Sequence, residues 1–237
     1  MEGYLLVDKP KDWTSFDVVG FVRRKVANVS GIAPKKIKVG HSGTLDPFAT
    51  GLLIILVGKS YTRQAATLLK NDKTYQVTMQ LDAVSTTGDP EGIIAQNNHP
   101  PVAPDILTIK AAMNNLIGEI DQVPPAYSAI KVNGVRAYKL ARSNQSVVIA
   151  PRKVTIHSLN LIAYDYPEVI FEANVSSGTY IRTLVEDLAK TFDRSAYTKE
   201  LRRTSIGKYS ISDAVMAEAI NEYNISSLLK SDLALIK

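Results

Sequence analysis

The pattern of apolar and polar positions along the chain predicts several strands of a central sheet. Residues 52–57 are aliphatic without interruption, which is typical of a strand buried on both faces. Residues 74–81 alternate strictly between polar and apolar side chains, as in a strand with one face in the core. Shorter β-rich runs predict further strands at residues 3–8, 152–161 and 168–175.

Helical spacing of apolar positions predicts helices between these strands. Thr14, followed three residues later by Asp17, has the form of a capping box at a helix start. Apolar side chains then recur on one side of the expected helix, at Val18, Val19, Val22 and Val26. The same kind of spacing favours helix at residues 61–69, 104–116, 138–142 and 180–190, and in a small tail after about Ser212.

Turn-forming residues separate these elements. Residues 82–104 are polar and contain Gly-Asp-Pro and His-Pro-Pro, so we expect a long exposed connection with His99 in solvent. The Asn133-Gly134 pair predicts a hairpin turn. At 237 residues without an internal repeat, one large domain or one domain with a small appendage is expected.

Composition and charge narrow the possible partners. The net charge is +5, which leans toward an anionic partner such as nucleic acid without proving one. No apolar run approaches the roughly 20 residues that cross a membrane, and the N-terminus lacks the pattern of a signal peptide. We therefore expect a soluble cytoplasmic protein with no membrane partner.

Cysteine and histidine usage excludes several chemistries. The chain has no cysteine, which excludes disulfides, thiol catalysis and cysteine-bound zinc. His41, His99 and His157 are far apart in sequence and lack the spacing of metal ligands. His157 is interpreted as structural.

The stretch from Lys38 to Gly51 is the strongest candidate for a functional site. It reads Lys-Val-Gly-His-Ser-Gly-Thr-Leu-Asp-Pro-Phe-Ala-Thr-Gly and leads directly into the buried strand. Pro47 pushes Asp46 away from helical geometry, so this carboxylate lies on a constrained loop. The alternative is an Asp-Pro turn in which Asp46 bonds its own backbone, and both readings stay open on local grounds.

Several kinds of chemistry can be weighed for Asp46. Metal-dependent phosphoryl transfer is disfavoured, because the motif has no second carboxylate and no Walker-type sequence. A Ser42–His41–Asp46 triad is disfavoured because adjacent side chains do not normally face each other. Covalent catalysis by Asp46 remains. It requires an ionised carboxylate and hence a cation nearby, and an aromatic side chain would be useful for stacking on a base. The basic run 34–38 beside the motif is either a solvated surface or a phosphate contact.

The stretch from Lys38 to Gly51 closely resembles the catalytic loop of the bacterial tRNA pseudouridine synthase B (TruB) family, with Ser42 in place of the usual threonine. Further motifs of that family occur in the same order along the chain. They are Gly3–Pro10 with Thr14-Ser15, Asp72–Tyr75, Val123–Lys131 with Gly134, Tyr138 and Ala141-Arg142, Ser177–Arg182, and Leu201–Arg203. The resemblance implies an α/β protein of the α+β type with a mixed central sheet flanked by helices and a small C-terminal helical extension.

The resemblance also implies roles for individual residues. Asp46 matches the catalytic aspartate, and Arg182 matches the arginine that pairs with it. Tyr75 matches a tyrosine stacked on the flipped base, and Tyr180 a second tyrosine that contacts the substrate. His41 matches a histidine that helps displace bases of the RNA loop. In isolation, Tyr75 and Arg182 have ordinary alternatives, as a core residue and a surface ion pair.

Leu201 matches a residue that lines the base pocket, although ordinary packing would explain it equally well.

The chain departs from the family pattern at Thr62, where the family usually has a lysine near the RNA. Lys59 or Arg63 is a candidate for supplying that charge.

The expected reaction is isomerisation of uridine to pseudouridine at T-loop position 55 of tRNA. The resemblance implies no metal, nucleotide or redox cofactor. We expect a monomer that binds the tRNA T-stem loop without an obligate protein partner. We also expect residues 1–210 to form the catalytic domain and residues 211–237 a small extension, with no RNA-binding PUA domain. Two alternatives are a non-catalytic tRNA-binding module and an isomerase guided to another RNA by partner proteins.

Overall fold

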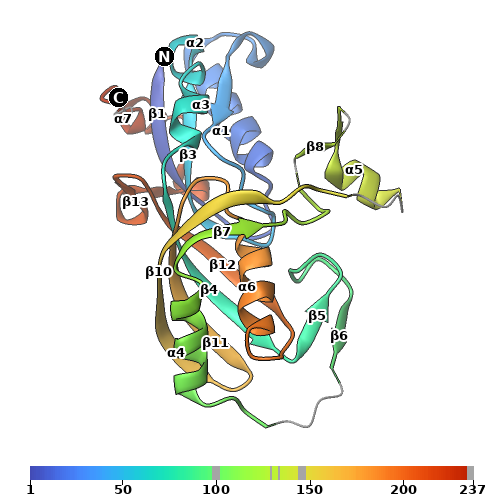
Figure 1. Cartoon of the computed structure of the whole chain (residues 1–237). Coiled ribbons are helices and arrows are strands. Elements are labelled where there is room, and N and C mark those ends of the chain that lie inside the picture. Colours follow the sequence, from blue (N-terminus) through green and yellow to red (C-terminus); the bar gives the residue numbers. More distant parts are fainter. Residues whose placement is uncertain (98–101, 129, 133, 144–147, 234–237) are drawn as a thin grey trace. The chain divides into compact units, whose positions relative to one another are not determined.

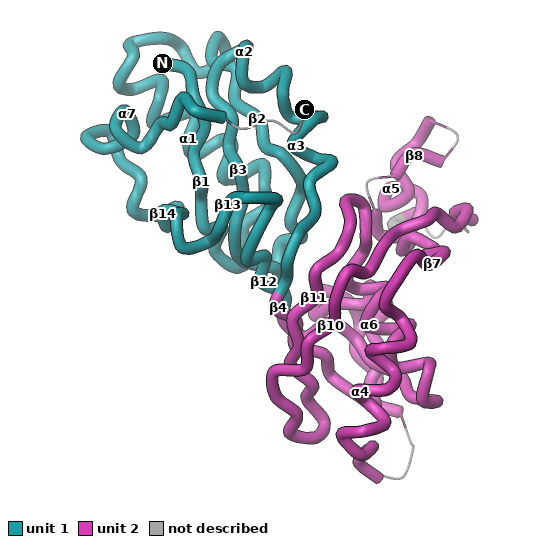
Figure 2. Tube along the Cα trace, turned by 60° about the vertical axis from the view of Figure 1, so that its left-hand side comes forward, with its two compact units in different colours: residues 1–75, 201–237 teal, residues 76–200 magenta. Residues whose placement is uncertain are grey.

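The computed structural model describes residues 1–97, 102–128, 130–132, 134–143 and 148–233. His99 and Asn133, named in the sequence interpretation, lie outside these residues. The chain forms two compact units, shown in different colours in Figure 2. Unit 1 contains residues 1–75 and 201–237, and unit 2 contains residues 76–200. The strands β4 and β12 each run from one unit into the other.

Ten strands of the described residues join in one mixed sheet, as Figure 1 shows in part. Their order is β14-β1-β3-β12-β4-β11-β10-β7, with β2 beside β3 and β13 beside β12. The strands are β1 (Gly3–Lys9), β2 (Val39–His41), β3 (Thr50–Val57), β4 (Lys73–Leu81), β7 (Gly118–Gln122), β10 (Arg152–Asp165), β11 (Glu168–Val175), β12 (Ala196–Ile206), β13 (Tyr209–Ser210) and β14 (Val215–Met216). The mixed central sheet implied by the family resemblance is therefore confirmed.

The sheet of unit 1 is centred on β3, whose side chains are buried on both faces as predicted. β1 pairs with it antiparallel from Gly3↔Val57 to Lys9↔Gly51, and β12 pairs with it in parallel. One face packs against the helix α1 (Ser15–Ser30), through apolar side chains that include Leu53, Ile55 and Val57. The other face, with Leu52, Ile54 and Leu56, packs against Leu68 and Tyr209. Burial of both faces explains the uninterrupted apolar run.

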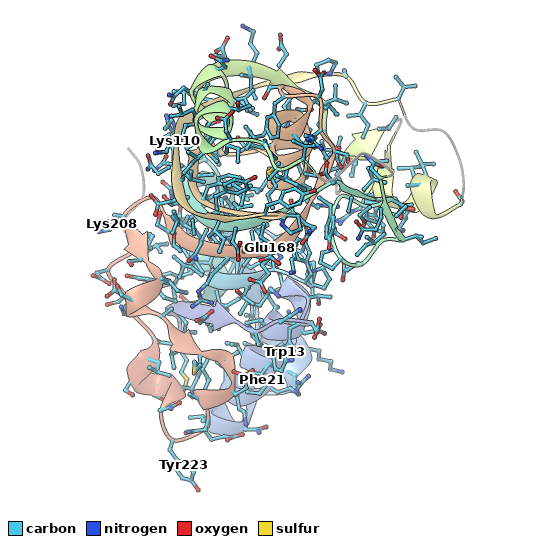
Figure 3. All side chains as sticks on the ribbon, turned by 90° about the horizontal axis from the view of Figure 1, so that it is seen from below. Trp13, Phe21, Lys110, Glu168, Lys208 and Tyr223 are labelled. Atoms are coloured by element: carbon cyan, nitrogen blue, oxygen red, sulfur yellow. The ribbon has the colours of Figure 1, made fainter. Side chains whose placement is uncertain are left out.

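The helix α1 begins with the predicted capping box. The Thr14 hydroxyl accepts a bond from the Asp17 N–H at 3.0 Å, and the Asp17 carboxylate accepts from the Thr14 N–H at 2.8 Å. The valines of the predicted stripe are buried. Trp13 and Phe21 lie together at one side of this helix, with ring centroids 5.6 Å apart (Figure 3). These contacts fix α1 against the sheet of unit 1.

In place of a single helix over residues 61–69, unit 1 has two short helices, α2 (Lys59–Thr62) and α3 (Ala65–Leu69). Beyond Ser210 the chain is less helical than the sequence favours. This segment consists of the 3-10 turns η2 (Ile211–Asp213) and η3 (Ala217–Ala219), the strand β14 and the helix α7 (Ile225–Leu228). β14 pairs with β1 in parallel, so that sheet pairing overrides local helical spacing here.

Unit 2 is built on the antiparallel strands β7, β10 and β11. The helix α6 (Ile181–Lys190) buries its predicted apolar stripe. The helix α4 (Ile106–Asn115) packs on β10 (Figure 1) and buries Ile109 and Met113, but Ile106 of its predicted stripe is exposed. Two small hairpins complete the unit. They are β5 (Ala83–Ser85) with β6 (Ile94–Gln96), and β8 (Lys131–Val132) with β9 (Val135–Arg136), the latter followed by the helix α5 (Ala137–Arg142).

Two sequence interpretations of unit 2 need correction. The connection after Asp82 is not simply exposed, because it forms the β5–β6 hairpin and buries Asp82, Ala83 and Asp89. Residues 196–200, directly before Leu201, belong to the long strand β12, which the sequence pattern did not predict. In the described part of the chain, no helix has the length and apolar character required to span a bilayer.

Candidate active site

Asp46 lies on the loop between β2 and β3 in unit 1, and its side chain is partly buried. The Asp46 carbonyl accepts a bond from the Ala49 N–H at 3.1 Å, which closes a turn over Pro47. A backbone turn is therefore present at Asp46-Pro47, whereas a bond from the Asp46 side chain to its own backbone stays a prediction. The turn is compatible with a functional carboxylate, because it holds the backbone at Asp46 in one conformation.

Two buried cations fix this loop at its ends. The ammonium group of Lys9, which is 0% exposed, donates to the carbonyls of Pro10 at 2.8 Å, Trp13 at 2.6 Å and Pro47 at 3.2 Å. The Arg203 guanidinium, 1% exposed, donates to the carbonyls of Leu52 at 2.8 Å and Gly43 at 3.1 Å. Charged donors make stronger hydrogen bonds than neutral ones, so these contacts restrict the loop strongly.

The loop is also held at its centre by a side chain from α1. The Ser15 hydroxyl accepts from the Leu45 N–H at 2.9 Å and donates to the Leu45 carbonyl at 3.2 Å. Where the loop enters β3, Gly51 has φ 107°, and a Cβ there would lie 2.3 Å from the Arg203 carbonyl. Only glycine fits this close approach of two strands. No individual role was predicted from the sequence for these motif positions.

His41 lies at the end of β2 and is partly buried. Its ring meets the Phe16 ring edge-on, with centroids 5.2 Å apart, and its Nδ1 accepts a bond from the Gly43 N–H at 3.3 Å. Burial lowers the pKa of His41, and the positive charge of Arg203 lowers it further. The imidazole is therefore neutral at neutral pH, with its proton on Nε2.

The Ser42–His41 arrangement of a hydrolase is not formed. Nδ1 of His41 is used by Gly43, and the buried Ser42 hydroxyl has no hydrogen-bond partner among the described residues. A general base must lie within hydrogen-bond reach of the nucleophile that it activates. The geometry therefore disfavours the triad further.

Tyr75 and Leu201 also belong to unit 1. Tyr75 lies in β4 with 8% of its surface exposed, and Leu201 lies in β12 with 7% exposed. Near Tyr75, the ammonium group of Lys73 donates to the carbonyls of Leu69 at 2.7 Å and Asn71 at 2.5 Å. Burial, followed by the charge of Arg203, lowers the pKa of Lys73 to about 8. These contacts fix the start of β4, the strand that carries Tyr75.

Arg182 lies in α6 of unit 2 and forms a buried ion pair with Asp89 at 3.0 Å, with the two side chains 5% and 3% exposed. It also donates to the carbonyls of Thr87 at 2.8 Å and Tyr127 at 2.9 Å. Asp89 accepts from the Thr87 hydroxyl at 2.6 Å and the Glu91 N–H at 3.0 Å. The Arg182 guanidinium therefore binds a carboxylate and two backbone carbonyls of unit 2. Pairing of Arg182 with Asp46 stays a prediction.

Tyr180 precedes α6 and is held by the backbone. Gln122, which is fully buried, accepts from the Tyr180 N–H at 2.8 Å and donates to the Tyr180 carbonyl at 3.1 Å. The Arg152 guanidinium lies over the Tyr180 ring, 4.7 Å from its centroid, in a cation–π contact. Gln122 and Asp89 are supporting residues that the sequence interpretation missed, because nothing in their local sequence indicates these distant partners.

Within the described residues, no group of three or more acidic or histidine side chains is placed to hold a metal ion.

The predicted site residues are distributed over the two units. Unit 1 contains His41, Asp46, Tyr75 and Leu201, and unit 2 contains Tyr180 and Arg182.

Comparison with known proteins places the fold and the motifs in one family. Structures of an H/ACA RNP bound to a substrate RNA containing 2′-deoxyuridine and of an archaeal box H/ACA sRNP complex are similar, with TM-scores of 0.63 and 0.62 at 22% and 24% identity. Each likeness covers 91% of this chain and 51% of the other, so this chain spans about half the length of those solved chains. At this identity, the likeness shows the fold.

Curated relatives are much more similar in sequence. A protein of Flavobacterium johnsoniae named tRNA pseudouridine synthase B is 41% identical over 89% of this chain and 91% of its own length. Proteins of the same name from Chlamydia trachomatis serovar L2 and Aquifex aeolicus are 36% and 41% identical, over 100% and 92% of this chain and 94% and 73% of their own.

The family described as "TruB family pseudouridylate synthase (N terminal domain)" matches residues 28–181. This match covers the loop of Asp46, the start of β4 and the turn before α6. The sequence motifs, the fold and these relatives agree, and the chain belongs to the TruB family of pseudouridylate synthases.

Proposed function

We propose that this protein isomerises uridine to pseudouridine in the T loop of tRNA, at the position conventionally numbered 55. The name shared by the relatives, tRNA pseudouridine synthase B, supports tRNA as the substrate. The observation that carries the chemistry is the loop of Asp46, clamped by Lys9 and Arg203. Such a loop suits a carboxylate that must meet one atom of a substrate.

In the proposed reaction, Asp46 attacks the ribose C1′ of the target uridine or acts in an equivalent step that frees the uracil. The bond from C1′ to the base nitrogen breaks and the base rotates. A new bond then forms between C1′ and C5, and any bond from Asp46 to C1′ breaks in that step, so that the carboxylate is regenerated. The proton on C5 leaves, and the nitrogen gains one. Atoms therefore balance within one nucleoside, and we propose that no cofactor takes part.

The other site residues serve base flipping and binding. Extrusion of a base costs a few kcal/mol of unstacking, which stacking on Tyr75 offsets in part. Arg182 is proposed to stabilise the charged form of Asp46. Tyr180 contacts the substrate, and Leu201 lines the base pocket.

His41 displaces bases of the loop, and its neutral imidazole and the adjacent Phe16 ring support this role. Both present apolar ring surface, of the kind on which nucleic-acid bases stack.

We further propose a cytoplasmic monomer that acts on the tRNA T-stem loop without an obligate protein partner. Residues 1–210 are proposed as the catalytic domain, because all of the family motifs lie within them, and residues 211–237 as a small extension.

Incubation of the purified protein with an unmodified tRNA transcript, followed by mapping of pseudouridine, tests the proposal. Product at position 55 is the expected result. The variant Asp46→Asn should lose isomerisation while it retains tRNA binding, because it keeps the shape of the loop and removes the nucleophile. A fully active Asp46→Asn enzyme would contradict the role of Asp46.

The same assay separates the alternatives. Binding of tRNA by the wild type without product would favour a non-catalytic RNA-binding module. Absence of both binding and product would favour a different RNA target.

A further inference from the structure

Two residues that are paired across the sheet of unit 2 both contact Tyr180. Arg152, at the start of β10, lies opposite Gln122, at the end of β7 (Figure 1). Gln122 holds the Tyr180 backbone through hydrogen bonds of 2.8 and 3.1 Å. The Arg152 guanidinium lies over the Tyr180 ring, with its Cζ 4.7 Å from the ring centroid. One cross-strand pair therefore contacts both the backbone and the ring of this tyrosine.

The turn that precedes Tyr180 is attached to the same strand. Nη2 of Arg152 donates to the carbonyl of Gly178, whose φ of 91° lies in the region that favours glycine. The Ser176 hydroxyl accepts a bond from the Thr155 N–H at 2.8 Å, and the Ser176 N–H donates to the Thr155 carbonyl at 2.8 Å. The backbone before Tyr180 is thus tied to β10 at two points, and the guanidinium is fixed relative to the ring that it covers.

The surroundings of Arg152 differ from those of an ordinary surface arginine. In the part of the chain that the structure describes, its guanidinium has no carboxylate partner, and its Nε is buried without a hydrogen-bond partner. Lys153, the next residue, instead forms an exposed ion pair with Glu119. A cation that loses water without gaining a carboxylate is stabilised by the electron-rich face of an aromatic ring. The Tyr180 ring and the Gly178 carbonyl are therefore the contacts that hold Arg152 in place.

Tyr180 is held by its ring and its backbone, and not by its hydroxyl. Among the described residues, the hydroxyl has no hydrogen-bond partner, and the side chain is partly exposed. A tyrosine side chain has two rotatable torsions, and the guanidinium over its ring restricts both. The polar end of the phenol is thereby kept at one position and has its hydrogen-bonding capacity unused by this part of the protein.

We infer that Arg152 is a positioning residue for the reaction, which orients the Tyr180 ring so that it meets the substrate nucleotide in one geometry. This inference rests on the proposed function, in which Tyr180 contacts the substrate. Arg152 acts through the ring and does not itself touch the RNA. A cation–π contact favours one ring orientation over the others by a factor of about 2 to 30.

The variant Arg152→Met tests the inference in the otherwise intact protein. It keeps a long apolar side chain and removes the cation. We expect kcat for pseudouridine formation to fall about 2- to 30-fold. The affinity for tRNA should change little, because phosphate contacts supply most of the affinity of proteins for nucleic acids. The control Lys153→Met removes the same charge from the next position of β10 and should leave kcat unchanged. A lower melting temperature of Arg152→Met with unchanged kcat of the folded fraction would overturn the inference.

A double-mutant cycle shows whether Arg152 acts through Tyr180. The double variant Arg152→Met/Tyr180→Leu should have the same kcat as Tyr180→Leu alone, because a positioning residue has no effect once its partner is absent. Losses that multiply would overturn the inference. If Arg152→Met lowers the folded fraction, Arg152→Lys, which keeps the charge and a donor for Gly178, enters the same cycle. A fall in tRNA affinity and in its salt dependence that persists beside Tyr180→Leu would assign Arg152 to a phosphate of the RNA and would also overturn it.

NMR of the free protein gives a measurement that does not depend on activity. The Arg152 Nε–H should be protected from exchange, and its resonance should move in Tyr180→Leu, because the ring current of the tyrosine is lost. An unchanged resonance would contradict the contact on which the inference depends. Failure of the proposed function is distinguishable, since it would appear as absence of product with the wild type, whereas failure of this inference leaves the wild type active and makes the losses independent.

Discussion

Lys9 donates a hydrogen bond from its ammonium group to the carbonyl oxygen of Pro47, 3.2 Å away, and Pro47 directly follows Asp46. A fully buried lysine is rare, because burial of a charge is unfavourable unless the charge is well bonded. Three carbonyls around the loop supply that bonding. Lys9 thereby joins the end of β1 to the loop of Asp46.

The variant Lys9→Met tests this connection. It keeps the length of the side chain and removes the three hydrogen bonds, so the loop should lose its fixed position. Displacement of a reacting group by about 1 Å can cost on the order of 100-fold in rate. We expect kcat for pseudouridine formation to fall about 10- to 100-fold, with KM for tRNA much less affected. A purely structural role would lower the melting temperature and leave kcat of the folded fraction unchanged.

Asp89→Asn should destabilise unit 2. The variant keeps the shape of the side chain but leaves the buried guanidinium of Arg182 without its carboxylate partner. Loss of one partner of a buried pair costs about 3–5 kcal/mol, which urea unfolding would measure. The matched control is Glu119→Gln, whose partner Lys153 is exposed, and which should leave the free energy of unfolding unchanged. Equal unfolding free energies for both variants would contradict the importance of this pair.

Two variants of Tyr75 separate the effect of stacking on the flipped base from the effect of apolar packing within the protein. Tyr75→Phe keeps the ring and should retain most of the activity, whereas Tyr75→Leu keeps apolar volume without a ring. The second variant should lose stacking worth about 1–3 kcal/mol, measured as a roughly 5- to 150-fold fall in kcat/KM. Equal kinetics for the two variants would argue against a role for the ring.

The contact between Phe16 and His41 predicts a pH effect. Burial lowers the pKa of His41 below its ordinary value, and the Phe16 ring, itself 67% exposed, covers one side of the imidazole. Phe16→Ala should admit water to the imidazole and raise the His41 pKa, since water stabilises the charged form. Titration of the His41 ring by NMR would measure the shift. An unchanged or lower pKa would show that Phe16 does not exclude water from the ring.

The sequence predicts well what is determined over short distances. The capping box of Thr14 and Asp17 and the buried strand 52–57 depend on neighbours within a few residues, and both are present. The pattern of apolar and polar residues predicts the wrong secondary structure where pairing with a segment distant in sequence determines it. Residues 215–216 pair with β1 instead of forming helix.

The supporting residues of the candidate site could not be found from local sequence for the same reason. A lysine, an arginine or an aspartate is usually exposed, so Lys9, Arg203 and Asp89 read as surface charges until the fold supplies their partners. Asp89 and Arg182 are far apart in the chain, and only the tertiary structure brings them to 3.0 Å. The family motifs identify the loop of Asp46, but the contacts that hold it are visible only in the structure.

Unit 1 consists of two segments that are far apart in the chain, residues 1–75 and 201–237. This separation affects the order in which the contacts to the loop of Asp46 can form during synthesis. Arg203 lies 160 residues after Gly43, so the loop of Asp46 leaves the ribosome well before Arg203 and β14. Until Arg203 has been made, the loop has Lys9 and Ser15 of the N-terminal segment as partners. A chain that stops before β12 lacks the cation that holds Gly43 and Leu52, so this second buried cation reaches the loop only after the segment of unit 2 has been synthesised.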